Sequence, residues 1–258
     1  MRIAFWSPMH GCGVTAGMLA AAVAFANNGR SLLVTQTHYC MNNLELPLLP
    51  VGKGEKMLEG KGIDSLVRDF KSGQMAEKQI IENTIKISEN LSLLPGGKNR
   101  CRELYDDKHT RQVERRILSL AHDTFGNMFT ELNPGYSHRT VEQIEMTDLL
   151  VICIKQNIRM LDELEHWGVP EGKKKTIFLI GMYDKRSRYS SRYIEGKYGF
   201  MKKKKVYTLP YLSDYLDAIN NCHVSEFLIE GLCCSWKGKE KEFFDAVGKI
   251  SDGIGECL

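Results

Sequence analysis

The sequence predicts a doubly wound α/β fold, in which helices flank both faces of a mostly parallel β-sheet. Short apolar runs alternate with segments of helical periodicity along all 258 residues. Thr147–Gln156 and Lys175–Tyr183 are apolar at almost every position, which is typical of parallel strands buried on both faces. This alternation favours right-handed β-α-β units. No repeat or linker-like segment interrupts it, so we expect a single domain over residues 1–258.

The first half of the chain begins with a strand, a turn and a helix. Arg2–Trp6 is expected to be a buried strand that ends at Ser7-Pro8, and Thr15–Asn27 a helix that Gly29 stops. The remaining expected elements are strands at Ser31–Thr35, Leu91–Gly97 and Asn127–Leu132, and helices at Gly62–Phe70, Met75–Ile87 and Arg111–Ala121.

The second half repeats the alternation. A helix is expected from Ile158 to Gly168, between the two strongest apolar runs. The segment "KVYTLPYLSDYLDAINN" predicts a strand, a proline-bearing loop and a short helix. The chain closes with an amphipathic segment from Lys239. Such a segment can dock on a membrane, but its interspersed acidic residues favour packing of its apolar side against the sheet.

Composition narrows the class of protein. The formal net charge of +3 is too small to indicate a nucleic-acid binder by itself. The eight cysteines include no CxxC pair, which favours reduced thiols in a cytoplasmic protein. No run of about 18 apolar residues predicts a membrane span. The N-terminus is expected to be a first strand, since it lacks the apolar stretch of a signal peptide.

The stretch "MHGCGVTA" has the layout of a phosphate-binding loop between a strand and a helix. Glycines let a ligand approach the backbone closely, and the helix N-terminus offers free N–H groups at the positive end of its dipole. The residues expected to hold phosphate are His10, Gly11, Cys12, Gly13, Val14, Thr15 and Ala16. Thr15 stands where a phosphate loop places its Mg²⁺-binding hydroxyl.

Two other interpretations of this loop stay open. A dinucleotide fold needs G-x-G-x-x-G and a carboxylate after the next strand, but here the third glycine is Gly17 and the strand ends in Thr35-Gln36-Thr37. The loop can also be a tight turn without a ligand. Whichever interpretation holds, Cys12 is expected to be a small space-filling residue. His10 either lies near a phosphate or caps the strand.

Most of the chain resembles the MinD/ParA-type P-loop ATPases, and within them the TadZ/CpaE-like branch linked to pilus assembly. The loop stands in place of the family's K-G-G-x-G-K-T-T, with Met9 and Val14 at the two lysine positions. "MFTELNPG" is similar to the strand that ends in the metal-linked aspartate, and Glu131 takes that position. "YTLPYLSDYLDAINN" resembles the segment that closes the nucleotide pocket, which implies that Pro210 and Leu212 lie near the base.

The departures from the family pattern bear on chemistry. Thr35 and Thr37 replace the two aspartates of the second strand, one of which helps to position the attacking water. Each lysine-to-phosphate hydrogen bond is worth about 1.5–3 kcal/mol, so losing both lysines weakens triphosphate binding. Phosphoryl transfer depends mainly on electrostatic stabilisation. We therefore expect weak binding of ATP with Mg²⁺ at Thr15 and Glu131, no catalytic residue, and very slow or absent hydrolysis.

The resemblance implies a degenerate nucleotide-binding protein that localises or assembles a larger machine, such as a pilus or secretion system, and forms a homodimer. One alternative is a partition-type DNA-binding module that uses Lys202–Lys205 with Arg186, Arg188 and Arg192. A solvated turn is the favoured explanation of that lysine run, and the three arginines either add to the basic surface or line the pocket's rim. A second alternative is a scaffold without nucleotide. His122-Asp123 and Cys222-His223 have no metal-binding spacing.

Overall fold

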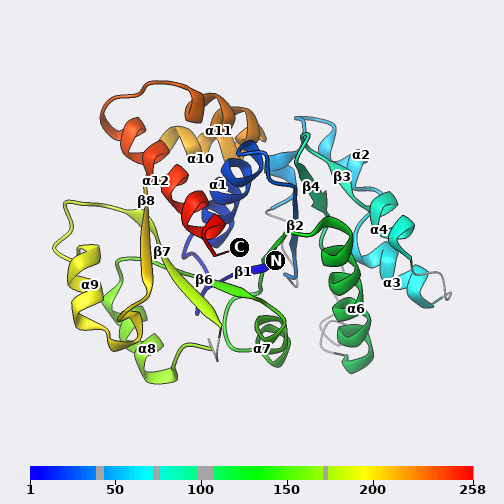
Figure 1. The fold of residues 1–258 in the computed structure, drawn as a ribbon, viewed down its shortest axis with the longest axis horizontal. Helices are drawn as coiled ribbons and strands as arrows, with labels where there is room; N and C mark the ends of the chain where they lie inside the picture. The colour runs from blue at the N-terminus through cyan, green and yellow to red at the C-terminus, as the bar shows by residue number, and fades with distance from the viewer. Residues whose placement is uncertain (39–43, 72–75, 98–106, 171–173, 258) are drawn as a thin grey trace.

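An eight-stranded sheet, mostly parallel, forms the centre of the molecule, with helices on both faces (Figure 1). The computed structural model describes residues 1–38, 44–71, 76–97, 107–170 and 174–257. The strands are β1 (Arg2–Trp6), β2 (Leu32–Gln36), β3 (Ile85–Lys86), β4 (Leu91–Leu94), β5 (Met128–Glu131), β6 (Leu149–Ile154), β7 (Lys175–Tyr183) and β8 (Lys205–Pro210). Their order is β3-β4-β2-β5-β1-β6-β7-β8, and β3 alone runs antiparallel to its neighbour. The predicted doubly wound α/β class is confirmed.

The helices connect the strands and cover the two faces of the sheet. They are α1 (Val14–Asn27), α2 (Gly54–Leu58), α3 (Ile63–Lys71), α4 (Glu77–Asn83), α6 (Lys108–Phe125), α7 (His138–Glu145), α8 (Ile158–Trp167), α9 (Ser191–Lys197), α10 (Ser213–Asn220), α11 (Val224–Cys233) and α12 (Gly238–Gly255). Two 3₁₀ turns, η1 (Leu46–Leu48) and η2 (Gly199–Met201), precede α2 and β8.

One face of the sheet is covered by α1, α10, α11 and α12, which lie together in the upper part of Figure 1. The small residues of α1, from Ala20 to Ala26, are fully or almost fully buried. They let α11 and α12 pack closely against α1. Phe243, Val247 and Ile250 of α12 are at most 1% exposed. This packing agrees with the expectation that the closing segment covers the sheet.

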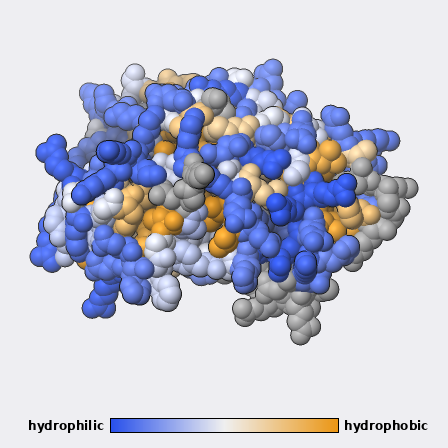
Figure 2. Space-filling view, turned by 60° about the horizontal axis from the view of Figure 1, so that its bottom comes forward, coloured by the Kyte–Doolittle hydropathy of each residue, from blue (hydrophilic) through white to orange (hydrophobic). Residues whose placement is uncertain are grey.

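The opposite face carries two smaller apolar clusters. Trp6 and Ile152 pack against α7, α8 and α9 on one half of the sheet. Leu33 packs against α3, α4 and α6 on the other half. Figure 2, which brings the bottom of Figure 1 forward, shows a largely hydrophilic surface in which apolar patches are separated by polar residues. Among the described helices, none has the length and apolar character needed to cross a bilayer.

The prediction of one helix over Met75–Ile87 is wrong in its last four residues. Helix α4 ends at Asn83, and Ile85 and Lys86 pair with β4 as the antiparallel edge strand β3. Residue 75 lies outside the described residues. The reason is tertiary: the unpaired edge of β4 offers backbone partners that helical periodicity does not reveal. Helices α7, α9 and α11 were not expected, because each is short or follows a loop-like sequence.

Two glycines inside neighbouring helices give a stability prediction. A Cβ at Gly231 in α11 would lie 1.9 Å from the ring of Phe244, whereas one at Gly248 in α12 meets nothing within 4 Å. We expect Gly231→Ala to lower the free energy of unfolding by about 1–3 kcal/mol through overpacking. Gly248→Ala should raise it by up to about 1 kcal/mol, because alanine favours helix. Urea denaturation of both variants measures this, and equal effects would contradict it.

Candidate functional site

A cavity of about 690 Å³ opens at the carboxyl ends of the strands. The turn after β1 and the first turn of α1 form its floor, and the ends of β5, β7 and β8 contribute the walls together with α10. This volume lies in the range of small-molecule and cofactor sites, and the carboxyl edge of an open parallel sheet is where such sites form. The location therefore indicates a ligand pocket built by the fold itself.

The glycine loop has the geometry of an anion cradle. Gly11 and Gly13 adopt positive φ angles of 75° and 77°, a region that favours glycine. Gly13 is also the N-cap of α1, and no side chain caps the helix there. The first turn of α1 contains no acidic residue. The N–H groups of Val14, Thr15 and Ala16 therefore begin a helix whose positive end faces the cavity.

The loop rests directly on β7. A Cβ at Gly181 would lie 2.9 Å from the carbonyl oxygen of Cys12, so only glycine permits this approach. The next residue, Met182, has a φ angle of 49° where the register with β8 shifts. Gly181 was not expected as a site residue. An isolated glycine in the otherwise bulky run "IFLIGMY" is the signal that could have found it.

Cys12 lies beneath the loop as a packing residue. Its side chain is 1% exposed, and its sulfur is 3.5 Å from that of Met160 in α8. Burial raises the pKa of the thiol, although the nearby ammonium of Lys155 partly opposes this rise. The side chain is thus held as a neutral thiol, and only its backbone faces the cavity side of the loop.

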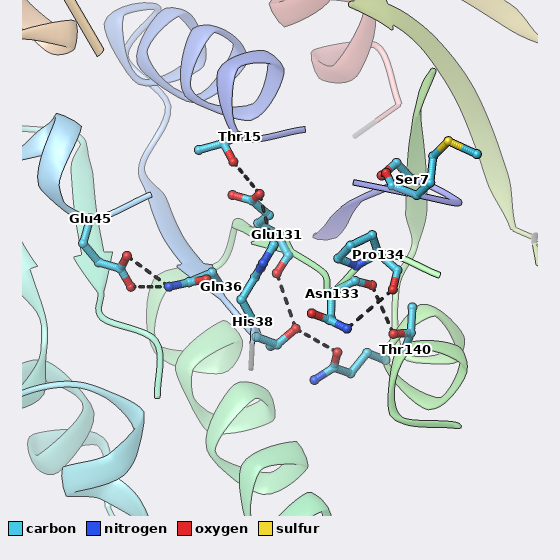
Figure 3. A network of polar contacts seen from close by, with 12 residues as sticks. Ser7, Thr15, Gln36, His38, Glu45, Glu131, Asn133, Pro134 and Thr140 are labelled. Atoms are coloured by element: carbon cyan, nitrogen blue, oxygen red, sulfur yellow. Dashed lines mark hydrogen bonds and ion pairs between the residues drawn. The ribbon is translucent and has the colours of Figure 1, made fainter. Parts of the chain in front are cut away.

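The two residues expected to hold a metal are in contact. The hydroxyl of Thr15 donates a hydrogen bond of 2.6 Å to Oε1 of Glu131 at the end of β5 (Figure 3). The Nε2 atom of His38 lies 3.2 Å from the same oxygen. Glu131 is 2% exposed, so its carboxylate oxygens are shielded from bulk solvent. Hydroxyl and carboxylate oxygens are ligands that Mg²⁺ prefers.

The end of β2, where the resemblance implies aspartates, has a structural role instead. Thr37 is 2% exposed, and its hydroxyl donates 2.9 Å to Oε1 of Gln143 in α7. The same hydroxyl also lies 3.4 Å from the backbone carbonyl oxygen of Glu131. Gln143 in turn donates to Glu114, which forms a buried ion pair with Arg139. Thr37 is therefore directed into the protein and does not line the cavity.

A second buried polar network lies on the other side of the end of β2. Gln36 donates to both carboxylate oxygens of Glu45, at 2.8 and 3.0 Å (Figure 3). The backbone N–H of Gly96 donates to the same carboxylate at 2.9 Å. Burial raises the pKa of Glu45 even though these hydrogen bonds favour its charged form. The network fixes the segment after β2 to the turn after β4.

The opposite wall of the cavity is mainly apolar. Leu209, Pro210 and Leu212 line it, followed by Tyr215 from α10. The hydroxyl of Tyr215 donates 2.6 Å to the carbonyl of Ala16, which ties α10 to the first turn of α1. The structure thus brings Pro210 and Leu212 to the same cavity as the loop. An apolar wall of this kind suits a planar ring, whereas the loop suits an anion.

All nine residues that the sequence proposes for a nucleotide, and both of those proposed for a metal, line this one cavity. They are His10, Gly11, Cys12, Gly13, Val14, Thr15, Ala16, Pro210, Leu212 and, on the metal side, Thr15 again with Glu131. The described lining residues include neither lysine nor arginine. Sequence reasoning missed His38 and Tyr215, which have no signal in the sequence alone.

The basic residues of the proposed DNA-binding surface do not line the cavity. Lys202 to Lys204 form a turn, with a φ angle of 62° at Lys203, and Lys205 pairs with Glu256. Arg186 pairs with Asp184 and lowers the pKa of that carboxyl to about 2. Arg188 lies over the ring of Tyr189. Arg192 is exposed.

The ring of His122 contacts the carboxylate of the adjacent Asp123 at 3.2 Å. Cys222 lines the cavity, and His223 precedes α11. Within the part of the chain that the structure describes, no cluster of three or more His, Cys, Asp or Glu side chains could hold a metal ion. Neither pair therefore forms a second site there.

Comparison with known proteins shows which fold the chain shares with solved structures. No protein-family model matches the chain, and no curated protein sequence matches it significantly. Solved structures do match over nearly the full length. A ParA family ATPase from Chlorobium tepidum TLS is 13% identical with a TM-score of 0.72, covering 97% of this chain and 98% of that one. The chain has the fold of the MinD and ParA ATPases.

Two further structures with this fold contain nucleotides. The septum site-determining protein MinD from Pyrococcus horikoshii OT3, complexed with Mg-ADP, is 14% identical with a TM-score of 0.72 and covers 100% of this chain and 98% of that one. A plasmid partition protein from Borrelia burgdorferi B31, bound to AMPPNP, is 12% identical with a TM-score of 0.70, covering 100% and 99%. Identities this low show the fold alone.

Proposed function

We propose that this protein binds an adenine nucleotide in the cavity above the glycine loop. The observation that carries the proposal is the glycine loop at the uncapped N-terminus of α1, open to the cavity beside the Thr15–Glu131 pair. Phosphates would lie on the backbone N–H groups that follow Gly13, and the base would contact Pro210 and Leu212. The Mg-ADP and AMPPNP complexes of proteins with the same fold support this choice of ligand.

The Thr15–Glu131 pair fits a Mg²⁺ ion that accompanies the nucleotide. The Thr15 hydroxyl and the buried Glu131 carboxylate are already within hydrogen-bond distance, so both oxygens can bind an ion or its water shell with little rearrangement. When bound, the ion would neutralise phosphate charge. His38 would then have to leave the Glu131 oxygen or contact a metal-bound water.

We propose further that hydrolysis is very slow or absent. The described cavity lining lacks lysine and arginine, and Glu131 is its one carboxylate. Thr37, at the position of a water-positioning aspartate in the resembled family, is bonded to Gln143 instead. Because Glu131 is assigned to the metal ion, no carboxylate of the described lining remains to orient the attacking water, and the bound nucleotide would act as a structural ligand.

The biological role that fits such a protein is localisation or assembly of a larger machine, as the resemblance to TadZ/CpaE-like proteins suggests. Nucleotide held without turnover would stabilise one state of the chain, such as a homodimer, by mass action. Proteins with this fold include a MinC:MinD cell division complex from Aquifex aeolicus. A pilus or secretion apparatus as the partner, and a cytoplasmic location, are parts of this proposal.

Thermal unfolding with and without nucleotide tests the proposal. At about 100 times Kd, MgATP or MgADP should stabilise the fold by about 2.7 kcal/mol and raise Tm by several degrees. Millimolar MgGTP serves as the comparison for base recognition. If no nucleotide at millimolar concentration shifts Tm, the binding proposal is wrong and a nucleotide-free scaffold replaces it. ATP consumption over hours, measured as released phosphate, tests slow hydrolysis.

A further inference from the structure

The glycine loop has a cationic neighbour from a different part of the chain. Lys155 is the first residue after β6, and β6 pairs in parallel with β1, so that Trp6 lies opposite Ile152. Parallel pairing brings the two strands out at the same edge of the sheet. The chain after β6 therefore passes beside the loop that follows β1, and the side chain of Lys155 lies at that point.

The ammonium group of Lys155 lies against the loop backbone. Its Nζ atom is 3.5 Å from the carbonyl oxygen of Gly11, and a Cβ at Gly11 would be 4.0 Å from Nζ. Burial raises the pKa of the Cys12 thiol, and the positive charge of Lys155 partly offsets that rise. Within the described residues it forms no ion pair with a carboxylate. The loop therefore has a positive charge beside it, and no carboxylate of the described residues is paired with that charge.

The backbone on both sides of Lys155 is fixed. Before it, β6 is hydrogen-bonded to β1 and β7 along its length. After it, Gln156 donates to the carbonyls of Asp184 and Tyr189 and accepts from the N–H of Asp184. Asn157 then caps α8 by accepting from Met160. The position of the lysine is thus set, whereas its long contact to Gly11 is weak enough for the side chain to rotate.

We propose that Lys155 supplies the phosphate-binding cation that the glycine loop itself lacks. Its ammonium binds the terminal phosphates as a loop lysine would, but from a position just after the neighbouring strand β6. The inference rests on nucleotide binding in this cavity. Lys155 does not line the cavity, so its ammonium must turn from the Gly11 carbonyl toward the terminal phosphates. The exchange is favourable, because a charged phosphate oxygen is a much stronger acceptor than a neutral carbonyl.

Nucleotides that differ only in phosphate number provide the test. Kd is measured by calorimetry for MgATP, MgAMPPNP, MgADP and AMP with wild type, Lys155→Gln, Lys155→Arg and the control Lys78→Gln. Lys78 is a surface residue of α4 whose side chain is 78% exposed, and its replacement removes the same charge far from the loop. We expect Lys155→Gln to weaken MgATP and MgAMPPNP about 10- to 100-fold. The affinity of Lys155→Gln for AMP should change less than about threefold. Lys155→Arg should retain part of the affinity for ATP, and Lys78→Gln should bind every nucleotide like wild type.

The outcomes separate this inference from the proposal beneath it. If wild type binds ATP and Lys155→Gln binds it equally well, the lysine is not the phosphate cation, while nucleotide binding stands. If ATP and AMP are weakened to the same extent, the lysine supports the fold of the loop and the inference is wrong. If wild type binds no nucleotide, both the inference and the proposed function fail. A loss that occurs only at protein concentrations where the chain dimerises would place the ammonium on a second copy's nucleotide and overturn the assignment within one chain.

Discussion

Gly13→Asp is expected to abolish nucleotide binding, with a loss of at least roughly a hundredfold in affinity for MgATP. Gly13 caps α1 with a φ angle of 77° and lies at the centre of the cradle. A carboxylate there would stand where the phosphate charge is expected, and repulsion between like charges in a partly enclosed cavity is strong. Calorimetry with MgATP and the nucleotide-dependent shift in Tm both measure the loss.

The other end of the same helix offers a matched control. Gly29 also has a φ angle of 77°, and a Cβ there would meet nothing within 4 Å. Gly29→Asp therefore carries the same backbone strain and the same charge change, but at the end of α1 remote from the cavity. It should lose stability without losing affinity. If Gly29→Asp weakens MgATP binding as much as Gly13→Asp does, the effect comes from helix α1 as a whole and the glycine loop is not the phosphate site.

Arg139→Met is expected to lower the free energy of unfolding by about 3–5 kcal/mol. The side chains of Arg139 and Glu114 are 8% and 3% exposed, and they form an ion pair between α7 and α6. Removing the arginine leaves the carboxylate of Glu114 buried without its main counter-charge. Gln143 bonds to the same carboxylate and to Thr37, so the loss should extend to the strand end beside Glu131. Urea denaturation followed by circular dichroism measures the change.

The double variant Glu114→Met with Arg139→Met separates buried charge from lost packing. Two apolar side chains of similar volume leave no buried charge unpaired, and such replacements are often neutral. The double variant should therefore regain most of the stability that Arg139→Met loses. A double variant no more stable than the single one would mean that hydrogen bonds of the network, and not the unpaired charge, dominate this cost.

The sequence predicted much of the central sheet because its strands carry their own signal. Runs such as Leu149–Ile154 are apolar at every position, which is typical of parallel strands buried on both faces. Helices preceded by clear turn residues, above all the helix after Gly13, could also be predicted from the sequence. The edge strand at Ile85 was not, because its conformation depends on a partner, β4, that lies across the sheet.

The candidate site likewise contains residues that the sequence predicted and residues that it did not. The glycine loop, Thr15, Glu131 and Pro210 could be proposed from order along the chain, and the cavity brings them together. Gly181 had a local signal in its bulky strand, which Cys12 explains once the loop is seen to rest on it. His38 and Tyr215 had none, because their contacts to Glu131 and Ala16 join segments far apart in sequence.

By itself, the sequence determined the fold class, the position of the glycine loop and the absence of lysine within that loop. Those properties depend on residues close together in the chain, where periodicity, turn residues and spacing act directly. The tertiary structure alone decided that Thr37 is turned toward Gln143 and that Lys155 lies beside Gly11. Both contacts join segments far apart in the chain, which the order of strands and the helices that connect them bring to one edge of the sheet.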